Sequence, residues 1–220
     1  MPRENFQTAL EELRAALLDM GELVRDRLRQ GLTAFLDGDK ELARQVRDGD
    51  AAVNERYFEL EARCIDLFAL EQPVANDLRL VAGSFKILTD LERIGDLAAN
   101  LAEYALASTE EVGKREVAGI GDLALEMVED ALAAYEDRDP AACVAVAERD
   151  DELDDRCERA STALIESLMA EAESVDREGL LDAVETVLLA IRDLERVGDH
   201  AVNVAGRTQY VVDGDPELIH

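Results

Sequence analysis

The sequence predicts an all-α fold of two tandem, pseudo-symmetric three-helix bundles, built from six long antiparallel helices. Three observations lead to this fold class. Apolar residues recur at steps of three and four along nearly the whole chain, which is the period of an α-helix. Apolar residues make up 48% of the chain, mostly Leu and Ala, and aromatic residues only 4%, which favours helix over sheet. An eleven-residue motif also occurs twice, so the chain is internally repeated.

The first half of the chain is expected to form helices at residues 5–37, 40–70 and 73–108. Gly38 suits the position just after a helix, and Asp39 suits the N-cap of the next one. Pro73 cannot continue a helix but fits the first turn of a new one, so it separates the second helix from the third. Residues 108–113 contain two acids and a glycine and are the best candidate for a linker.

The second half repeats this pattern, with helices expected at residues 121–136, 140–172 and 177–211. Asp139 is the expected N-cap of the middle helix, and Pro140 occupies its first position. Helices of about 30 residues are roughly 45 Å long, and short turns between them favour antiparallel bundles. We therefore predict one three-helix repeat at residues 1–109 and a second at residues 110–220.

The charge balance excludes several classes of partner. There are 51 acidic residues against 23 basic ones, which gives a net charge of −28. Binding to nucleic acid or to an anionic membrane needs clustered basic residues, so neither is expected, and no basic pocket for an anion is expected either. Dense carboxylates with only three lysines are typical of a halophilic protein in a salt-rich cytoplasm. No segment resembles a membrane span or a secretion signal, so we expect a cytoplasmic protein without membrane insertion.

The repeated motif carries the candidate functional residues. Its copies begin at Asp90 and Asp193, and eight of their eleven positions are identical. Each copy places Glu, Asp and Asn at positions i, i+4 and i+8, which brings three oxygen-bearing side chains to one face of a helix. These residues are Glu92, Asp96 and Asn100 in the first copy, and Glu195, Asp199 and Asn203 in the second.

A second pair of oxygen-bearing side chains is expected to face each motif from the preceding helix. The pairs are Asp50 with Asn54, and Asp150 with Asp154. Each pair lies about as far before its turn as the motif lies after it, so an antiparallel hairpin places them at similar heights. Oxygen ligands suit hard cations such as Mg²⁺, Mn²⁺ or Ca²⁺. A solvated face, on which the acids pair with neighbouring arginines, would have the same spacing.

Other residues of the motif bear on this hypothesis. Gly95 and Gly198 lie between the acids, and a glycine inside a helix costs about 1 kcal/mol relative to alanine. A neighbouring helix or a ligand is therefore expected to approach the backbone there. His200 has Leu97 at the matching position, so no role is expected for it. The sequence has a single Glu-x-x-His run, at residues 217–220, whereas a di-iron oxidase needs this motif on two helices, and it has no glycine-rich phosphate loop; we therefore expect no enzymatic activity.

These residues resemble the PhoU family of phosphate-signalling regulators. The resemblance covers residues 5–211 and rests on the segment QPVANDLRL at 72–80, DLERIGD at 90–96, ERVGD at 195–199 and GDAAVN at 49–54. It implies two similar three-helix bundles. It also implies metal ions, iron or zinc, bound at Glu92 and Asp96, at Glu195 and Asp199, and at the facing pairs.

The family resemblance further implies repression of phosphate uptake through the phosphate-specific ABC transporter, with its ATPase subunit as the expected partner. In bacteria the family also couples this transporter to a sensor kinase; the acidity of this chain leaves that partner open. A homodimer is expected, because long helical bundles often associate. Two alternatives remain: a carboxylate-bridged metal-dependent hydrolase or oxidase, and a purely structural acidic helical adaptor.

Overall fold

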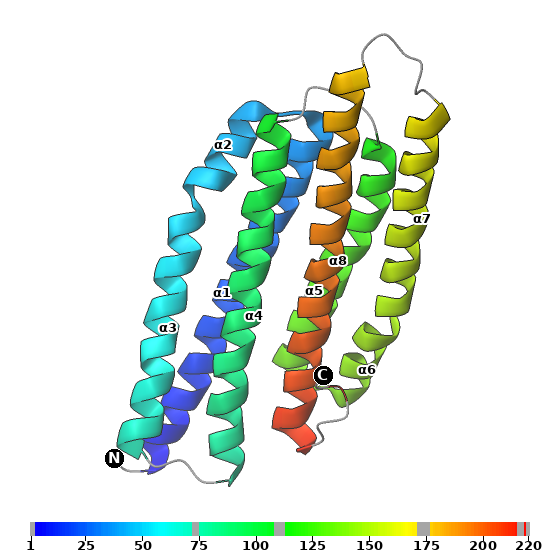
Figure 1. Ribbon diagram of the computed structural model, residues 1–220. Helices are drawn as coiled ribbons and strands as arrows, with labels where there is room; N and C mark the ends of the chain where they lie inside the picture. Colours follow the sequence, from blue (N-terminus) through cyan, green and yellow to red (C-terminus); the bar gives the residue numbers. More distant parts are fainter. Residues whose placement is uncertain (1–2, 72–74, 108–112, 171–176, 215–217, 219–220) are drawn as a thin grey trace.

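The computed structural model describes residues 3–71, 75–107, 113–170, 177–214 and 218, and these ranges contain helices and no strand. The helices are α1 (Arg3–Asp37), α2 (Lys40–Asp48), α3 (Asp50–Glu71), α4 (Ala75–Ala107), α5 (Lys114–Asp137), α6 (Pro140–Glu148), α7 (Asp150–Ala170) and α8 (Arg177–Asp213). In Figure 1, α2 and α3 form one bent rod, and α6 and α7 form another, so six long rods result. The all-α prediction is confirmed.

The turn after the first helix of each repeat has the predicted capping. The Asp39 carboxylate accepts hydrogen bonds from the backbone N–H groups of Glu41 and Leu42, both at 3.0 Å. Asp139 accepts the equivalent bonds in the second repeat, with Pro140 at the first turn. Gly38 has a φ of 66°, the left-handed conformation that glycine adopts easily after a helix.

The prediction of an unbroken second helix in each repeat was wrong. Gly49 interrupts the first repeat and Arg149 the second, and both have ψ near zero, which turns the chain between two helices. At Gly49 a Cβ atom would lie 2.5 Å from Nη1 of Arg27, so a larger residue would displace the Arg27 guanidinium. Because of these breaks, Asp50 and Asp150 become the first residues of α3 and α7.

Other predicted boundaries differ or cannot be compared. α5 begins at Lys114 rather than at residue 121, so the first helix of the second repeat is longer than expected. Pro73, the break at 174–176 and the boundary between residues 109 and 110 all lie outside the described residues.

The two repeats share one core. α4 and α8 lie side by side and antiparallel at the centre of the molecule, with α3 and α7 at its two outer edges (Figure 1). Behind them α1 meets α5, and Gly21 and Gly121 permit this approach. A Cβ atom on Gly21 would collide with Leu132 of the second repeat, and one on Gly121 would collide with Leu32 of the first. The reciprocal contacts indicate a pseudo-twofold relation between the repeats.

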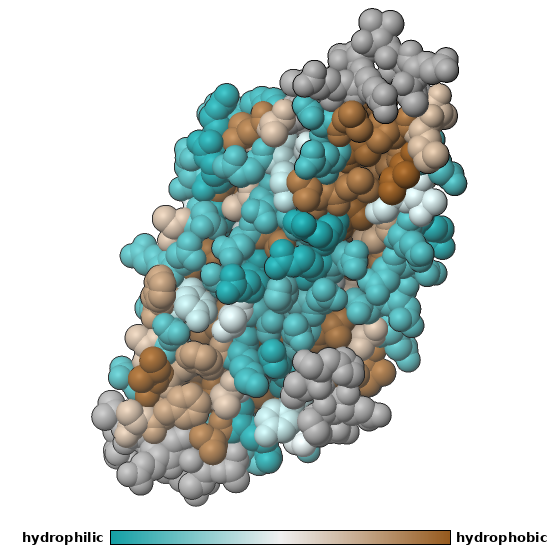
Figure 2. Space-filling model, in the orientation of Figure 1, coloured by the Kyte–Doolittle hydropathy of each residue, from teal (hydrophilic) through white to brown (hydrophobic). Residues whose placement is uncertain are grey.

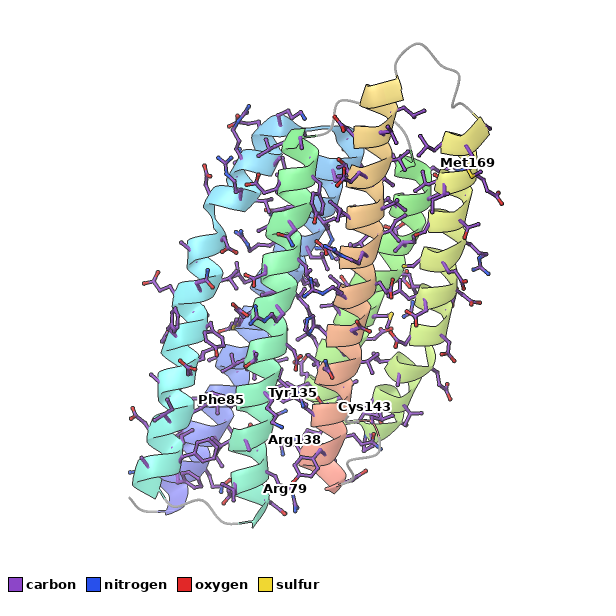
Figure 3. All side chains as sticks on the ribbon, viewed as in Figure 1. Arg79, Phe85, Tyr135, Arg138, Cys143 and Met169 are labelled. Atoms are coloured by element: carbon purple, nitrogen blue, oxygen red, sulfur yellow. The ribbon has the colours of Figure 1, made fainter. Side chains whose placement is uncertain are left out.

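Exposed apolar side chains gather near the tips of the two α3–α4 and α7–α8 hairpins. Ile65 and Leu78 are exposed in the first repeat, and Ile165 and Leu181 occupy the matching positions of the second. Figure 2 shows apolar surface at these two opposite ends, and Figure 3 places Met169, 73% exposed, at the end of α7. None of the helices in the described ranges is long and apolar enough to cross a membrane.

Candidate metal centre

Close helix packing surrounds the two glycines of the repeated motif. A Cβ atom on Gly95 would lie 3.0 Å from Val53 of α3. One on Gly198 would collide with Leu153 of α7 and lie 3.5 Å from the Oδ1 atom of Asp150. The predicted close approach to the backbone is confirmed, and the neighbouring helix makes it. This packing brings the acidic residues of each hairpin together.

We call Asp50, Asn54, Glu92 and Asp96 the first acidic cluster. The Asn54 amide donates a 2.9 Å hydrogen bond to Oδ2 of Asp50. Burial raises the pKa of Glu92, and the nearby charges of Asp96 and Asp50 raise it further. Burial and the charge of Asp50 likewise raise the pKa of Asp96. The predicted facing arrangement of α3 and α4 residues is therefore present.

We call Asp150, Asp154, Glu195 and Asp199 the second acidic cluster. Burial, followed by the charges of Asp154 and Asp199, raises the pKa of Asp150 to about 6. Burial also raises the pKa of Asp154 and of Glu195, and the repulsion between these carboxylates adds to the effect. In both clusters, like charges are held close together on two helices.

Each cluster contains a buried carboxylate oxygen without a hydrogen-bond partner. Oδ1 of Asp50 and Oδ1 of Asp150 are both buried without a partner, and these residues occupy matching positions in the two repeats. A cation would supply the missing interaction and reduce the repulsion. In the described part of the chain, no group of three or more His, Cys, Asp or Glu side chains is already gathered around one point. Cation binding therefore requires side-chain rotation within each cluster.

The solvated-face interpretation fits only part of the first cluster. Arg93 lies 3.3 Å from Asp96 and 3.5 Å from Glu92, so a neighbouring arginine does pair with these acids. In the second cluster, Glu195 and Asp199 have no basic partner within 4 Å among the described residues. Neighbouring arginines therefore do not account for both copies of the motif.

The two clusters also differ in the charge of the buried residue next to them. Arg27 is buried close to Asp50, and its positive charge offsets part of the first cluster's negative charge. The matching residue of the second repeat is Met127, which is neutral. Arg149, at the position that matches Gly49, points away to ion pairs with Glu126 and Asp130. The second cluster is therefore the more anionic one.

Asn100 lies elsewhere than predicted. Its amide donates a 3.0 Å hydrogen bond to Oδ2 of Asp193 on α8, and the Tyr104 hydroxyl donates to the same oxygen at 2.8 Å. The difference has a geometric cause: eight residues advance an α-helix by about 80° beyond two full turns. Asn100 therefore faces the other repeat rather than Asp50. Asn203, at the matching position of α8, is half-buried, and its place in a metal site stays a prediction.

His200 also has a role that the sequence analysis missed. Its Nδ1 atom lies 3.0 Å from Oδ1 of Asp90, and Nε of Arg207 donates a 2.9 Å hydrogen bond to Oδ2. Asp90 and Asp193 are matching, buried residues, and each accepts hydrogen bonds from the opposite repeat. Asp193 also pairs with Arg192 and Arg196 of its own repeat. We call these two carboxylates and their partners the α4–α8 seam. The one hint in the sequence was the presence of Asp at the start of both motif copies.

Comparison with known proteins decides the family. A family model described as the PhoU domain matches residues 17–105 and again residues 117–208. The chain belongs to the PhoU family. A relative from Pseudomonas putida, named phosphate-specific transport system accessory protein PhoU homolog, is 37% identical over 215 residues, 96% of this chain and 82% of the relative. The phosphate-specific transport system accessory protein PhoU of Escherichia coli (strain K12) is 29% identical over 220 residues, 95% of this chain and 86% of that protein.

Solved PhoU structures have the same fold. The crystal structure of PhoU from Pseudomonas aeruginosa has a TM-score of 0.86 and 35% identity, covering 96% of this chain and all of that one. The phosphate transport system regulatory protein PhoU from Streptococcus pneumoniae has a TM-score of 0.87 and 29% identity, covering 96% and 98%. These PhoU proteins are named as accessory or regulatory proteins rather than enzymes, as the sequence analysis predicted.

Proposed function

We propose that this PhoU protein is a cytoplasmic, metal-binding regulator that lowers phosphate uptake by a phosphate-specific ABC transporter. The match of the PhoU domain to both halves of the chain carries the regulatory part of the proposal. Relatives that align with 96% of the chain are named accessory proteins of the phosphate-specific transport system. We expect contact with the ATPase subunit, because that subunit powers transport from the cytoplasmic side.

The metal part of the proposal rests on the unpartnered Oδ1 atoms of Asp50 and Asp150. A buried polar atom without a partner costs about 1–3 kcal/mol, and repulsion within each cluster adds to this cost. A cation would relieve both. All eight side chains of the two clusters offer oxygen, which suits Mg²⁺, Mn²⁺ or Ca²⁺, whereas the family resemblance favours iron or zinc. The rotation that exposes the Asn54 oxygen would bring a neutral ligand to the first cluster.

The clusters lie close enough to the α4–α8 seam for cation binding to act on the whole central face. The pKa of Glu92 responds to the charge of His200, and that of Asp96 to the charge of Arg196, both from the opposite repeat. Figure 2 shows a broad hydrophilic band over the centre of this face. Cations bound beside it would hold α3 against α4 and α7 against α8, and would reduce the negative charge that a partner meets.

Uptake of radiolabelled phosphate in cells lacking this PhoU protein tests the proposal. In phosphate-rich medium we expect the deletion to raise uptake and the wild-type protein to restore the low rate. The variants Glu92→Ala/Asp96→Ala and Glu195→Ala/Asp199→Ala should restore it poorly, while Asp122→Ala/Glu158→Ala, which removes two exposed acids, should act like wild type. Unchanged uptake in the deletion strain would refute the regulatory role. Full restoration by both cluster variants would instead favour the structural adaptor.

The homodimer also stays a proposal. The reciprocal apolar surfaces at the two hairpin tips, with Ile65 and Leu78 at one and Ile165 and Leu181 at the other, are available for association. Sedimentation equilibrium should give a mass of about twice 24.2 kDa. A single species at the monomer mass across micromolar concentrations would exclude a stable dimer.

A further inference from the structure

The structure contains a basic groove, although the sequence analysis expected none. Arg115 of α5 and Arg156 and Arg159 of α7 line a hollow of about 470 Å³ between the two helices. Glu116 is the acidic residue on its wall. Sequence reasoning missed the groove because Arg115 is far from the other two arginines along the chain. Three arginines around one hollow contrast with the net charge of −28.

The groove exists because the second repeat has small residues where the first has large ones. Gly119, Ala160 and Ala163 replace Asp19, Leu60 and Arg63 of the first repeat. Leu60 is fully buried, and Arg63 crosses from α3 to an ion pair with Glu12 of α1 at 2.5 Å. A Cβ atom on Gly119, in contrast, would meet no atom within 4 Å. The first repeat thus fills the space that the second leaves open.

The charges at this place are also reversed between the repeats. In the first repeat, Arg56 is balanced by Glu59 at 2.7 Å and by Asp19 at 3.7 Å. The second repeat has Arg159 where the first has Glu59, and Gly119 where it has Asp19. It also has Arg115 where the first repeat has Ala15. Where the first repeat has one arginine paired with two acids, the second repeat has three arginines around a hollow.

These arginines keep donors available for a ligand. Arg156 donates to the Gly119 carbonyl at 3.1 Å and to Glu152 at 2.5 Å, which uses part of its five N–H groups. Arg159 reaches Asp155 only at 3.7 Å, and both side chains are about 70% exposed. Arg115 has no acidic partner within 4 Å among the described residues.

We propose that this groove binds a phosphoryl group, either of free orthophosphate or of a phosphorylated small molecule. Guanidinium groups match the geometry of phosphate oxygens. Glu152 pairs closely with Arg156 at 2.5 Å, whereas Arg159 lies 3.7 Å from Asp155 and Arg115 has no acid within 4 Å among the described residues, so these two arginines keep their charge available beside Glu116. The volume lies in the range of small-molecule sites, and Ile120, Ala160 and Ala163 provide an apolar floor. A long polyanion is disfavoured, because the rest of the molecule would repel it. Only a regulatory effect of this binding rests on the proposed function; the binding itself does not.

Isothermal titration calorimetry on the full-length, chelator-treated protein at fixed KCl tests the site. Chelation removes cations through which phosphate could bind at the acidic clusters. The probes are orthophosphate and magnesium-free ATP, and we expect saturable binding of at least one at one site per chain. Binding of orthophosphate would identify the free anion as the ligand, and binding of ATP alone would identify a phosphorylated small molecule.

Two variants and two matched controls locate that binding. Arg115→Gln/Arg159→Gln removes two guanidinium groups, and Gly119→Asp restores the acid of the first repeat in open space. Each should weaken binding about tenfold or more. Arg29→Gln/Arg44→Gln, which removes two exposed arginines of the first repeat, and Gly119→Ala should change it less than about twofold. Absence of saturable binding for both probes, or equal affinity in Arg115→Gln/Arg159→Gln and wild type, would overturn the proposal. Either result leaves the uptake experiment free to succeed.

Discussion

Replacement of Asp193 by alanine should weaken the contact between the two repeats more than any other single change in the α4–α8 seam. The Asp193 carboxylate has no exposed side-chain surface, and it lies on α8 where that helix meets α4. It accepts hydrogen bonds from Asn100 at 3.0 Å and from Tyr104 at 2.8 Å, both from the first repeat. Hydrogen bonds to the carboxylate raise the pKa of the Tyr104 hydroxyl to about 12, after the larger effect of burial.

The expected loss of stability follows from these contacts. A hydrogen bond to a charged group contributes about 1.5–3 kcal/mol, and the two bonds share one oxygen, so their contributions are less than additive. Tyr104 and Asn100 are only half-buried, and water can replace part of the loss. We therefore expect Asp193→Ala to lower the free energy of unfolding by about 2–4 kcal/mol, out of the 5–15 kcal/mol that is usual for a folded protein.

Urea unfolding in buffer of fixed, high KCl concentration measures this loss. Arg192→Ala removes the exposed partner of the Asp193 ion pair and should cost less than about 1 kcal/mol. Asp122→Ala controls for the removal of one negative charge from an acidic protein. A double-mutant cycle with Asn100→Ala should give a coupling of about 1 kcal/mol or more. If Asp193→Ala costs no more than Arg192→Ala, the seam does not stabilise the contact between the repeats.

Three further predictions concern pH, salt and packing. The pKa of Asp150 is raised from 3.8 to about 6 in the folded protein. The folded state therefore binds the extra proton, and the cation-free protein should lose about 1–2 kcal/mol as pH rises from about 4 to about 6, after solvent screening. Asp150→Asn should flatten this profile in pH-dependent urea unfolding; an unchanged slope would contradict the assignment. The acidic surface predicts a melting temperature that rises from low to molar KCl, and a flat calorimetric curve would remove the halophile interpretation. Gly198→Ala should cost about 1–3 kcal/mol, because its methyl group would collide with Leu153, whereas Gly119→Ala should stabilise by about 0.5–1 kcal/mol. Equal unfolding free energies for these two variants would contradict the packing described for α7 and α8.

The sequence predicted those parts of the fold that depend on local chemistry. Helix periodicity and the capping residues Asp39 and Asp139 gave the helix ends at the first turn of each repeat, because a cap acts on its own helix. The break at Gly49 was missed, and the buried Arg27 beside it could not be placed from the sequence, because it lies on another helix. A side chain that fills the space beside a glycine leaves no mark in the periodicity of the segment.

The candidate site shows the same division between local and long-range information. Asp50 and Glu92 face each other within one hairpin, and their sequence distances from its turn predicted this arrangement. The contacts of Asn100 with Asp193 and of His200 with Asp90 cross between repeats, and they depend on how α4 and α8 rotate against each other. Spacing within one helix does not determine that rotation.

The most direct test of the central claim is the metal content of chelator-stripped protein after equilibration with a single cation. Elemental analysis should find cation at both clusters of the wild type. Glu195→Ala/Asp199→Ala should lose the tighter site and Glu92→Ala/Asp96→Ala the weaker one, because Arg27 offsets the charge of the first cluster. Asp122→Ala/Glu158→Ala should retain the wild-type content. Equal metal content in all four proteins, for every cation tried among iron, zinc, magnesium, manganese and calcium, would contradict the claim that the duplicated acidic clusters bind metal.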